Sequence, residues 1–157
     1  MYEYGMKNFE SLTLGQLLEK SAAECPEKIA VVDGDRRITY RELNTRADAL
    51  AAGLAGIGFK KGDRAAIYMK NSVELMTAFY ALQKLGVIAV WINCLYRKNE
   101  AEFVLKNSGA RGVFIFRQWD GHNYLDEVLA LKNELTGLES VIVASESSGK
   151  NLISFDD

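Results

Sequence analysis

The run Val87-Ile88-Ala89-Val90-Trp91-Ile92 decides the fold, because six apolar residues in succession are typical of a strand that is buried on both faces. Comparable apolar runs occupy residues 65–69, 113–116 and 141–144, and helical patterns separate all of them. Crossovers of this length join parallel strands. The sequence therefore predicts an α/β fold, with an N-terminal β-hairpin followed by a doubly wound, mainly parallel sheet with flanking helices.

Two helices and a hairpin are predicted in the segment before the sheet. The tetrapeptides Thr13–Gln16 and Thr39–Glu42 each fit a capping box, which predicts a helix beginning at each of them. Between these helices, Asp33-Gly34-Asp35 separates two β-prone stretches and predicts the turn of the hairpin.

Three further helices are predicted over residues 73–85, 100–106 and 124–135. Asn71 with Glu74 is the expected start of the first of them. Because the apolar residues of this helix cover most of its circumference, we expect other elements to cover it on more than one side.

The composition is that of a soluble globular protein, with 48% hydrophobic residues, 25% charged residues and a net charge of -2. This charge gives no field that would gather nucleic acid, and no apolar run is long enough to span a membrane. With two cysteines and no signal-peptide pattern, we expect a cytoplasmic protein. Its compact part is expected over residues 12–144, with a loop-like tail over 145–157.

Isolated chemical signals favour structural roles over catalytic ones. The glycines between residues 56 and 62 follow a helix and precede a strand, the reverse of the order in a dinucleotide-binding turn. Ser147-Ser148-Gly149-Lys150 lacks the flanking residues of a phosphate loop. The single histidine, His122, is expected to be a solvated turn residue, and Cys25 and Cys94 are expected to be core thiols.

Two longer stretches resemble a known family. Residues 33–44, Asp-Gly-Asp-Arg-Arg-Ile-Thr-Tyr-Arg-Glu-Leu-Asn, are similar to the first core motif of the adenylate-forming enzymes. Residues 81–93, Ala-Leu-Gln-Lys-Leu-Gly-Val-Ile-Ala-Val-Trp-Ile-Asn, resemble the second, although Cys94 stands where proline is frequent. The family includes acyl-CoA synthetases and the adenylation domains of peptide synthetases. The resemblance implies that residues 1–157 are the N-terminal portion of the large domain of such a ligase.

The implied activity is that of an ATP-dependent carboxylic acid–CoA ligase, or acyl-CoA synthetase. In such ligases a carboxylate attacks the α-phosphate of ATP, with Mg²⁺ offsetting the phosphate charge, to give an acyl-adenylate and pyrophosphate. Coenzyme A then displaces AMP to form a thioester. The segment Tyr96–Glu100 resembles the aryl, medium-chain and long-chain fatty-acid ligases. Two alternatives stay open: the adenylation domain of a peptide synthetase, and a non-catalytic binding or scaffold module with the same fold.

The family's Ser/Thr/Gly-rich phosphate loop and its catalytic lysine have no counterpart in residues 1–157. We therefore expect the chain alone to be inactive and to bind none of the three cofactors strongly, and no residue is assigned a catalytic role. Such a portion of a larger domain is also expected to self-associate, with the helix 73–85 as its uncovered apolar face.

Arg117 is the one candidate for ligand binding, together with Trp119. Arg117 follows the predicted strand 113–116, and ligands of open α/β sheets bind beyond the carboxyl ends of the strands. The family resemblance implies that Arg117 contacts the nucleotide end of coenzyme A, where a guanidinium binds phosphate through paired hydrogen bonds. The neighbouring indole of Trp119 is expected to stack on adenine, as aromatic side chains do with bases. A solvated arginine after a strand is the structural alternative.

Overall fold

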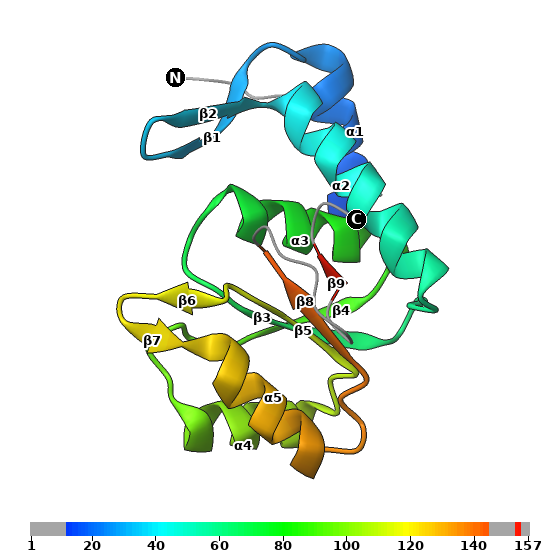
Figure 1. Ribbon diagram of the computed structural model, residues 1–157. Coiled ribbons are helices and arrows are strands. Elements are labelled where there is room, and N and C mark those ends of the chain that lie inside the picture. The colour runs from blue at the N-terminus through cyan, green and yellow to red at the C-terminus, as the bar shows by residue number, and fades with distance from the viewer. Residues whose placement is uncertain (1–11, 145–152, 155–157) are drawn as a thin grey trace, which may run out of the picture.

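The computed structural model describes residues 12–144 and 153–154, and it confirms the predicted α/β fold. The main sheet has the strand order β4-β3-β5-β8-β9, and each neighbouring pair is parallel. Helices lie on both faces of the sheet (Figure 1). An N-terminal unit of two helices and a hairpin lies beyond the helix on one of these faces. The strands are β3 (Arg64–Tyr68), β4 (Ile88–Trp91), β5 (Gly112–Ile115), β8 (Ser140–Val143) and β9 (Ile153–Ser154).

The N-terminal unit is organised by the two predicted capping boxes, both of which are present. The side-chain oxygens of Thr13 and Thr39 accept the backbone N–H three residues further on, which satisfies an amide that the first turn leaves unpaired. The hairpin turns at Gly34, whose φ of 59° favours glycine. The elements are α1 (Leu14–Glu24), β1 (Ile29–Asp33), β2 (Arg36–Thr39) and α2 (Tyr40–Gly56).

Helix α3 (Val73–Leu85) lies between this unit and the sheet. It packs against α1 and α2 on one side and against β3 and β4 on the other, which confirms that it is covered on more than one side. The helix is capped by Ser72, whose hydroxyl accepts the Leu75 N–H at 3.1 Å, and not by Asn71 as predicted. None of its large apolar side chains is exposed. The prediction that α3 is an uncovered apolar face is therefore wrong.

Helices α4 (Lys98–Ser108) and α5 (Tyr124–Glu134) cover the opposite face of the sheet. Strand β5 leads into α5 through β6 (Gln118–Trp119) and β7 (His122–Asn123), an antiparallel pair that the sequence analysis missed. Its turn, Asp120-Gly121, has positive φ at both residues, 48° and 72°. An Asp-Gly pair is typical of such turns, so the signal was present in the sequence.

The side chains of the sheet alternate between two core clusters, because successive residues of a strand point to opposite faces. One cluster lies on the α3 side of the sheet and the other on the α4 and α5 side. Members of the first include Ala65, Ile67, Phe114 and Ile142; members of the second include Ala66, Tyr68, Val113 and Val141.

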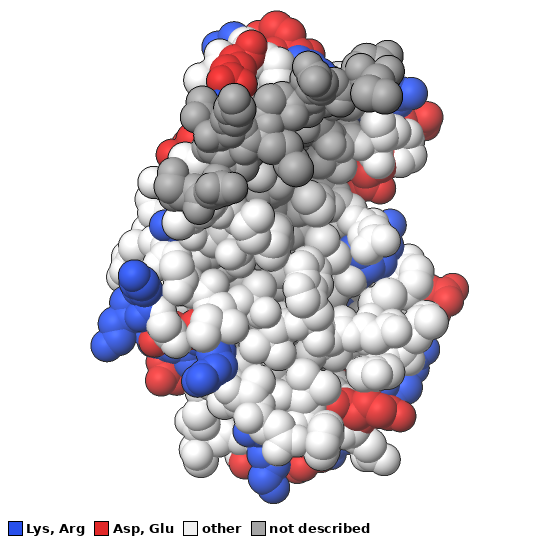
Figure 2. Space-filling view, turned by 180° about the vertical axis from the view of Figure 1, so that it is seen from behind, with Lys and Arg blue, Asp and Glu red and all other residues white. Residues whose placement is uncertain are grey.

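Strand β4 is not buried on both faces, which corrects the prediction for the run 87–92. Strands β3, β5 and β8 are almost entirely buried, but β4 ends the sheet, and Ile88 and Trp91 are 48% and 52% exposed. Seen from behind, the molecule has a face with few charged side chains at its centre (Figure 2).

The expected loop-like tail, 145–157, lies outside the described residues except for β9. These two residues extend the sheet beside β8, with Ile142 opposite Ile153. The sequence analysis did not predict this strand.

Candidate functional site

The carboxyl ends of the parallel strands meet at one edge of the sheet, which is where ligands of open α/β sheets bind. Tyr68, Trp91 and Ile115 end the strands β3, β4 and β5 at this edge. The segments that leave these strands lead to α3, to α4 and to the β6–β7 hairpin. Among the described residues, these segments can place side chains at this edge.

Arg117 and Trp119 follow β5 at this edge of the sheet. Arg117 is exposed two residues after the end of β5, and its carbonyl oxygen accepts the Leu125 N–H at 3.3 Å, which fixes this backbone against α5. Trp119 is partly buried and packs against the core cluster on the α4 and α5 side. Arg117 lies at the carboxyl end of β5, as expected. Part of the Trp119 indole packs against the core and is not available to a ligand.

Two buried tyrosines hold the loop that follows β4. The Tyr68 hydroxyl donates to the carbonyl oxygen of Tyr96 at 2.5 Å, and the Tyr124 hydroxyl donates to that of Cys94 at 2.7 Å. The Tyr68 and Tyr124 rings meet edge to face, with their centroids 4.9 Å apart. These contacts fasten the loop after β4 to the ends of β3 and α5.

Glu127 and His122 extend this network from the α5 side. The Tyr68 hydroxyl lies 3.2 Å from one carboxylate oxygen of Glu127, and His122 Nε2 lies 3.2 Å from the other. Burial, followed by the charge of Glu127, raises the pKa of Tyr68, so the phenol stays protonated and remains a donor.

The prediction for His122 is wrong. The residue belongs to β7, its side chain is 20% exposed, and its ring stands edge to face against Tyr124 at 4.6 Å. The sequence analysis missed the whole network. One signal was available, because a tyrosine within an apolar run needs a hydrogen-bond partner for its hydroxyl when it is buried.

The remaining sequence signals have structural roles. Gly58 and Gly62, with φ of 89° and 91°, turn the chain between α2 and β3, which confirms the turn interpretation. Cys25 and Cys94 are free and partly buried, so they are less enclosed than the core thiols we predicted.

The described part of the chain has neither a metal-binding cluster nor a membrane-spanning helix. Among residues 12–144 and 153–154, no group of three or more His, Cys, Asp or Glu side chains could hold a metal ion. No helix in these ranges is long and apolar enough to cross a bilayer.

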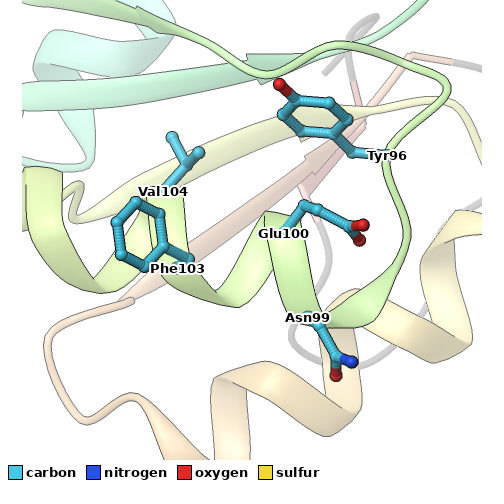
Figure 3. A pocket seen from close by; sticks show the side chains of 5 residues that line it. All are labelled: Tyr96, Asn99, Glu100, Phe103 and Val104. Carbon is cyan, nitrogen blue, oxygen red and sulfur yellow. The ribbon is translucent and has the colours of Figure 1, made fainter.

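An open groove of about 360 Å³ lies beside α4 (Figure 3). Glu100, one of its lining residues, already accepts the backbone N–H of Arg97 at 3.2 Å. Mainly apolar walls with a single carboxylate do not suit a phosphate-bearing nucleotide. The lining residues are Tyr96, Asn99, Glu100, Phe103 and Val104.

The fold is that of an α/β protein with an open parallel sheet and helices on both faces, and comparisons with known proteins give the family. Residues 18–155 match the family model described as AMP-binding enzyme. The chain belongs to this family and corresponds to the N-terminal part of the adenylate-forming enzymes.

Curated relatives include ligases with different named products. The chain is 32% identical over 135 residues to the 2,3-dihydroxybenzoate-AMP ligase of Bacillus subtilis (strain 168), covering 86% of this chain and 25% of that protein. It is 34% identical over 120 residues to the human mitochondrial medium-chain acyl-CoA ligase ACSF2, covering 75% and 20%. The chain thus spans at most a quarter of the length of these two relatives.

A solved structure shares the architecture. The anthranilate CoA ligase AuaEII in complex with anthranoyl-AMP matches with a TM-score of 0.83 and 27% identity, over 92% of this chain and 27% of that one. The relatives named here differ in their named product, so the similarity shows the family of this chain and does not distinguish among these products.

Proposed function

We propose that this chain is the N-terminal part of an ATP-dependent carboxylic acid–CoA ligase of the acyl-CoA synthetase type. The observation that carries the proposal is the match to a CoA ligase over 92% of the chain at a TM-score of 0.83. The segment Tyr96–Glu100, which resembles the acyl-CoA synthetases in sequence, supports the same assignment.

Within such a ligase, Arg117 and Trp119 are proposed to contact the nucleotide end of coenzyme A. A guanidinium offers phosphate a planar fork of charge-assisted hydrogen-bond donors, and Arg117 is exposed where the parallel strands end. Trp119 contributes the exposed part of its indole as a stacking surface for adenine.

ATP and Mg²⁺ are not assigned to residues of this chain. The described residues provide no cluster of metal-binding side chains, and the sequence has no phosphate loop of the family's type. When bound in a ligase of this family, these cofactors activate the carboxylate as an acyl-adenylate. The contribution of this chain is then to build the sheet edge and to hold the loop after β4.

One alternative function is favoured by a specific observation. The Bacillus subtilis relative is named for ligation to AMP, and its name mentions no coenzyme A. An adenylating domain that passes its acyl group to a carrier protein, as in a peptide synthetase, is therefore the second candidate. A non-catalytic module is the third.

The test uses a protein that starts with residues 1–157 and continues through the phosphate loop and lysine of the family. We expect acid-dependent exchange of labelled pyrophosphate into ATP, followed by formation of an acyl-CoA thioester. Exchange with transfer to a carrier protein, but not to coenzyme A, would support the second candidate. Absence of exchange with a broad panel of carboxylic acids would support the third.

The isolated 157-residue chain is the control in this experiment. We expect no exchange from it, because it lacks the groups that stabilise the phosphate charge during adenylation. If the pure 157-residue chain catalysed this exchange, the proposal that the ATP-binding groups lie outside it would be refuted.

A further inference from the structure

The Tyr68 hydroxyl has one hydrogen and two acceptors within reach. Its oxygen lies 2.5 Å from the carbonyl oxygen of Tyr96 and 3.2 Å from a carboxylate oxygen of Glu127. A phenol donates a single hydrogen bond. The first acceptor belongs to the loop after β4, residues 92–97, and the second belongs to α5. The orientation of one O–H bond therefore decides whether the loop or the helix is bonded to the end of β3.

Glu127 is a nearly buried carboxylate whose second oxygen faces His122. The Glu127 side chain is 10% exposed, and its Oε2 lies 3.2 Å from His122 Nε2. This Nε2 atom is itself buried and makes no hydrogen bond, so the ring N–H does not point at the carboxylate. The attraction between the two side chains therefore depends on the charge of the imidazole. Within the described residues, Tyr68 is the side chain that donates a hydrogen bond to Glu127.

We propose that the charge of His122 selects the acceptor of the Tyr68 hydroxyl, which makes these residues a pH-dependent switch for the loop after β4. Protonated His122 compensates the charge of Glu127, and Tyr68 then donates to the Tyr96 carbonyl. When the partly exposed imidazole releases its proton to solvent, the carboxylate is left buried with an uncompensated charge. A hydrogen bond to a charged acceptor is about twice as strong as one to a neutral acceptor. The hydroxyl then turns toward Glu127, and the loop loses this bond.

The loop keeps its other hydrogen bonds in both states. The Arg97 guanidinium donates to the carbonyl oxygens of Leu95 and Tyr96 at 3.0 and 2.9 Å, and the Tyr124 hydroxyl donates to that of Cys94 at 2.7 Å. The switch therefore loosens the loop and does not release it. Because Tyr96 lines the groove beside α4 (Figure 3), the bond that changes lies next to this groove.

His122 is the group in this network suited to respond near neutral pH. Histidine is the residue type whose charge ordinarily changes between about pH 5 and about pH 8. Burial raises the pKa of Tyr68 and of Tyr124, so both phenols stay protonated in this range. Three more groups face the two tyrosines, from the start of α4, the turn between β6 and β7, and the loop itself. They are Arg97, Asp120 and the Cys94 thiol.

Amide hydrogen exchange from about pH 5 to about pH 8, corrected for the intrinsic exchange rate, tests the switch in the 157-residue chain. The N–H groups of Leu95, Tyr96 and Arg97 are bonded within the loop or to the first turn of α4, so their protection reports loop opening. We expect this protection to fall about twofold to tenfold as the pH rises. The midpoint should coincide with that of the NMR signals of the His122 ring, which belong to the only histidine of the chain.

Two variants connect the effect to the carboxylate. Glu127→Gln keeps the side-chain length and an acceptor but removes the charge, so loop protection should no longer follow the titration of His122. Glu134→Gln, in the same helix, is the matched control, because its carboxylate is 52% exposed and contacts Lys98 at 3.1 Å. It should leave the pH dependence intact.

Three results would each overturn the proposal. They are loop protection that does not change with pH or rises with it, a midpoint that differs from that of His122, and a pH dependence that persists in Glu127→Gln. The first two are measured on the unsubstituted chain, so they do not depend on the folding of a variant.

Discussion

Gly112 lies where the central strand β5 has no room for a side chain, so Gly112→Ala should destabilise the fold. A Cβ built at this position would lie 2.6 Å from the Phe59 ring at Cζ and 3.5 Å from Ile142. The Phe59 ring cannot withdraw easily, because it is 3% exposed and the Arg111 guanidinium covers it at 4.7 Å.

The magnitude follows from two opposing effects. Overpacking a core costs about 1–3 kcal/mol, whereas replacing glycine by alanine at a compatible backbone position stabilises by about 0.4–1 kcal/mol through the unfolded chain. The positive φ values of the chain do not include Gly112, so the backbone itself accepts alanine. We expect a net loss of about 1–2 kcal/mol in the free energy of unfolding.

Urea denaturation at low protein concentration measures this loss, and two further variants make the test specific. Gly53→Ala, in α2 with no atom within 4 Å of the added Cβ, should stabilise by about 0.5–1 kcal/mol. Combining Gly112→Ala with Phe59→Leu should cost less than the sum of the single changes, by about 1 kcal/mol. If Gly112→Ala is neutral or stabilising, or if the two changes are additive, the steric argument is refuted.

Three more predictions concern hydrogen bonds and the candidate ligand site. Tyr124→Phe removes the donor to the Cys94 carbonyl and should lower stability by about 0.5–1.5 kcal/mol in the same assay; an unchanged value would contradict the role of that bond. The hydrogen bond from Arg111 holds the pKa of Asp63 below its ordinary value. The ionised Asp63 carboxylate therefore stabilises the fold above about pH 4, and this stabilisation is lost as the pH falls through the pKa of Asp63 in the folded state. The stability difference between the unsubstituted protein and Asp63→Asn should therefore shrink from pH 7 to strongly acidic pH, and a difference that does not vary with pH would exclude this linkage. In the longer ligase, Arg117→Ala should raise the KM for coenzyme A about tenfold to hundredfold while adenylation stays nearly unchanged, whereas equal losses in both steps would indicate a folding defect.

The sequence by itself determined the elements whose cause is local. Capping boxes at Thr13 and Thr39 and the Asp-Gly turn at Gly34 involve residues three or fewer apart, so their physics can be read from the order of the residues. The apolar runs likewise fixed the positions of β3, β4, β5 and β8 within one or two residues. The motifs in residues 33–44 and 81–93 indicated the adenylate-forming family for the same reason, since they are continuous in the chain.

Part of the candidate site could also be predicted. The place of Arg117 beyond β5 followed from the rule for parallel strands. The partial burial of Trp119 did not, because the short β6–β7 hairpin directs the indole toward the core cluster of α4 and α5.

Only the tertiary structure decided what depends on strand order and on contacts between distant residues. An apolar run such as 87–92 looks the same whether it lies at the centre or at the end of a sheet. Among the described residues it pairs with β3 alone, and Ile88 and Trp91 are about half exposed. The hydroxyl of Tyr68 finds Glu127 fifty-nine residues away, a pairing that no local pattern encodes. Such contacts depend on which helices and strands pack against each other, and the whole buried core determines that packing.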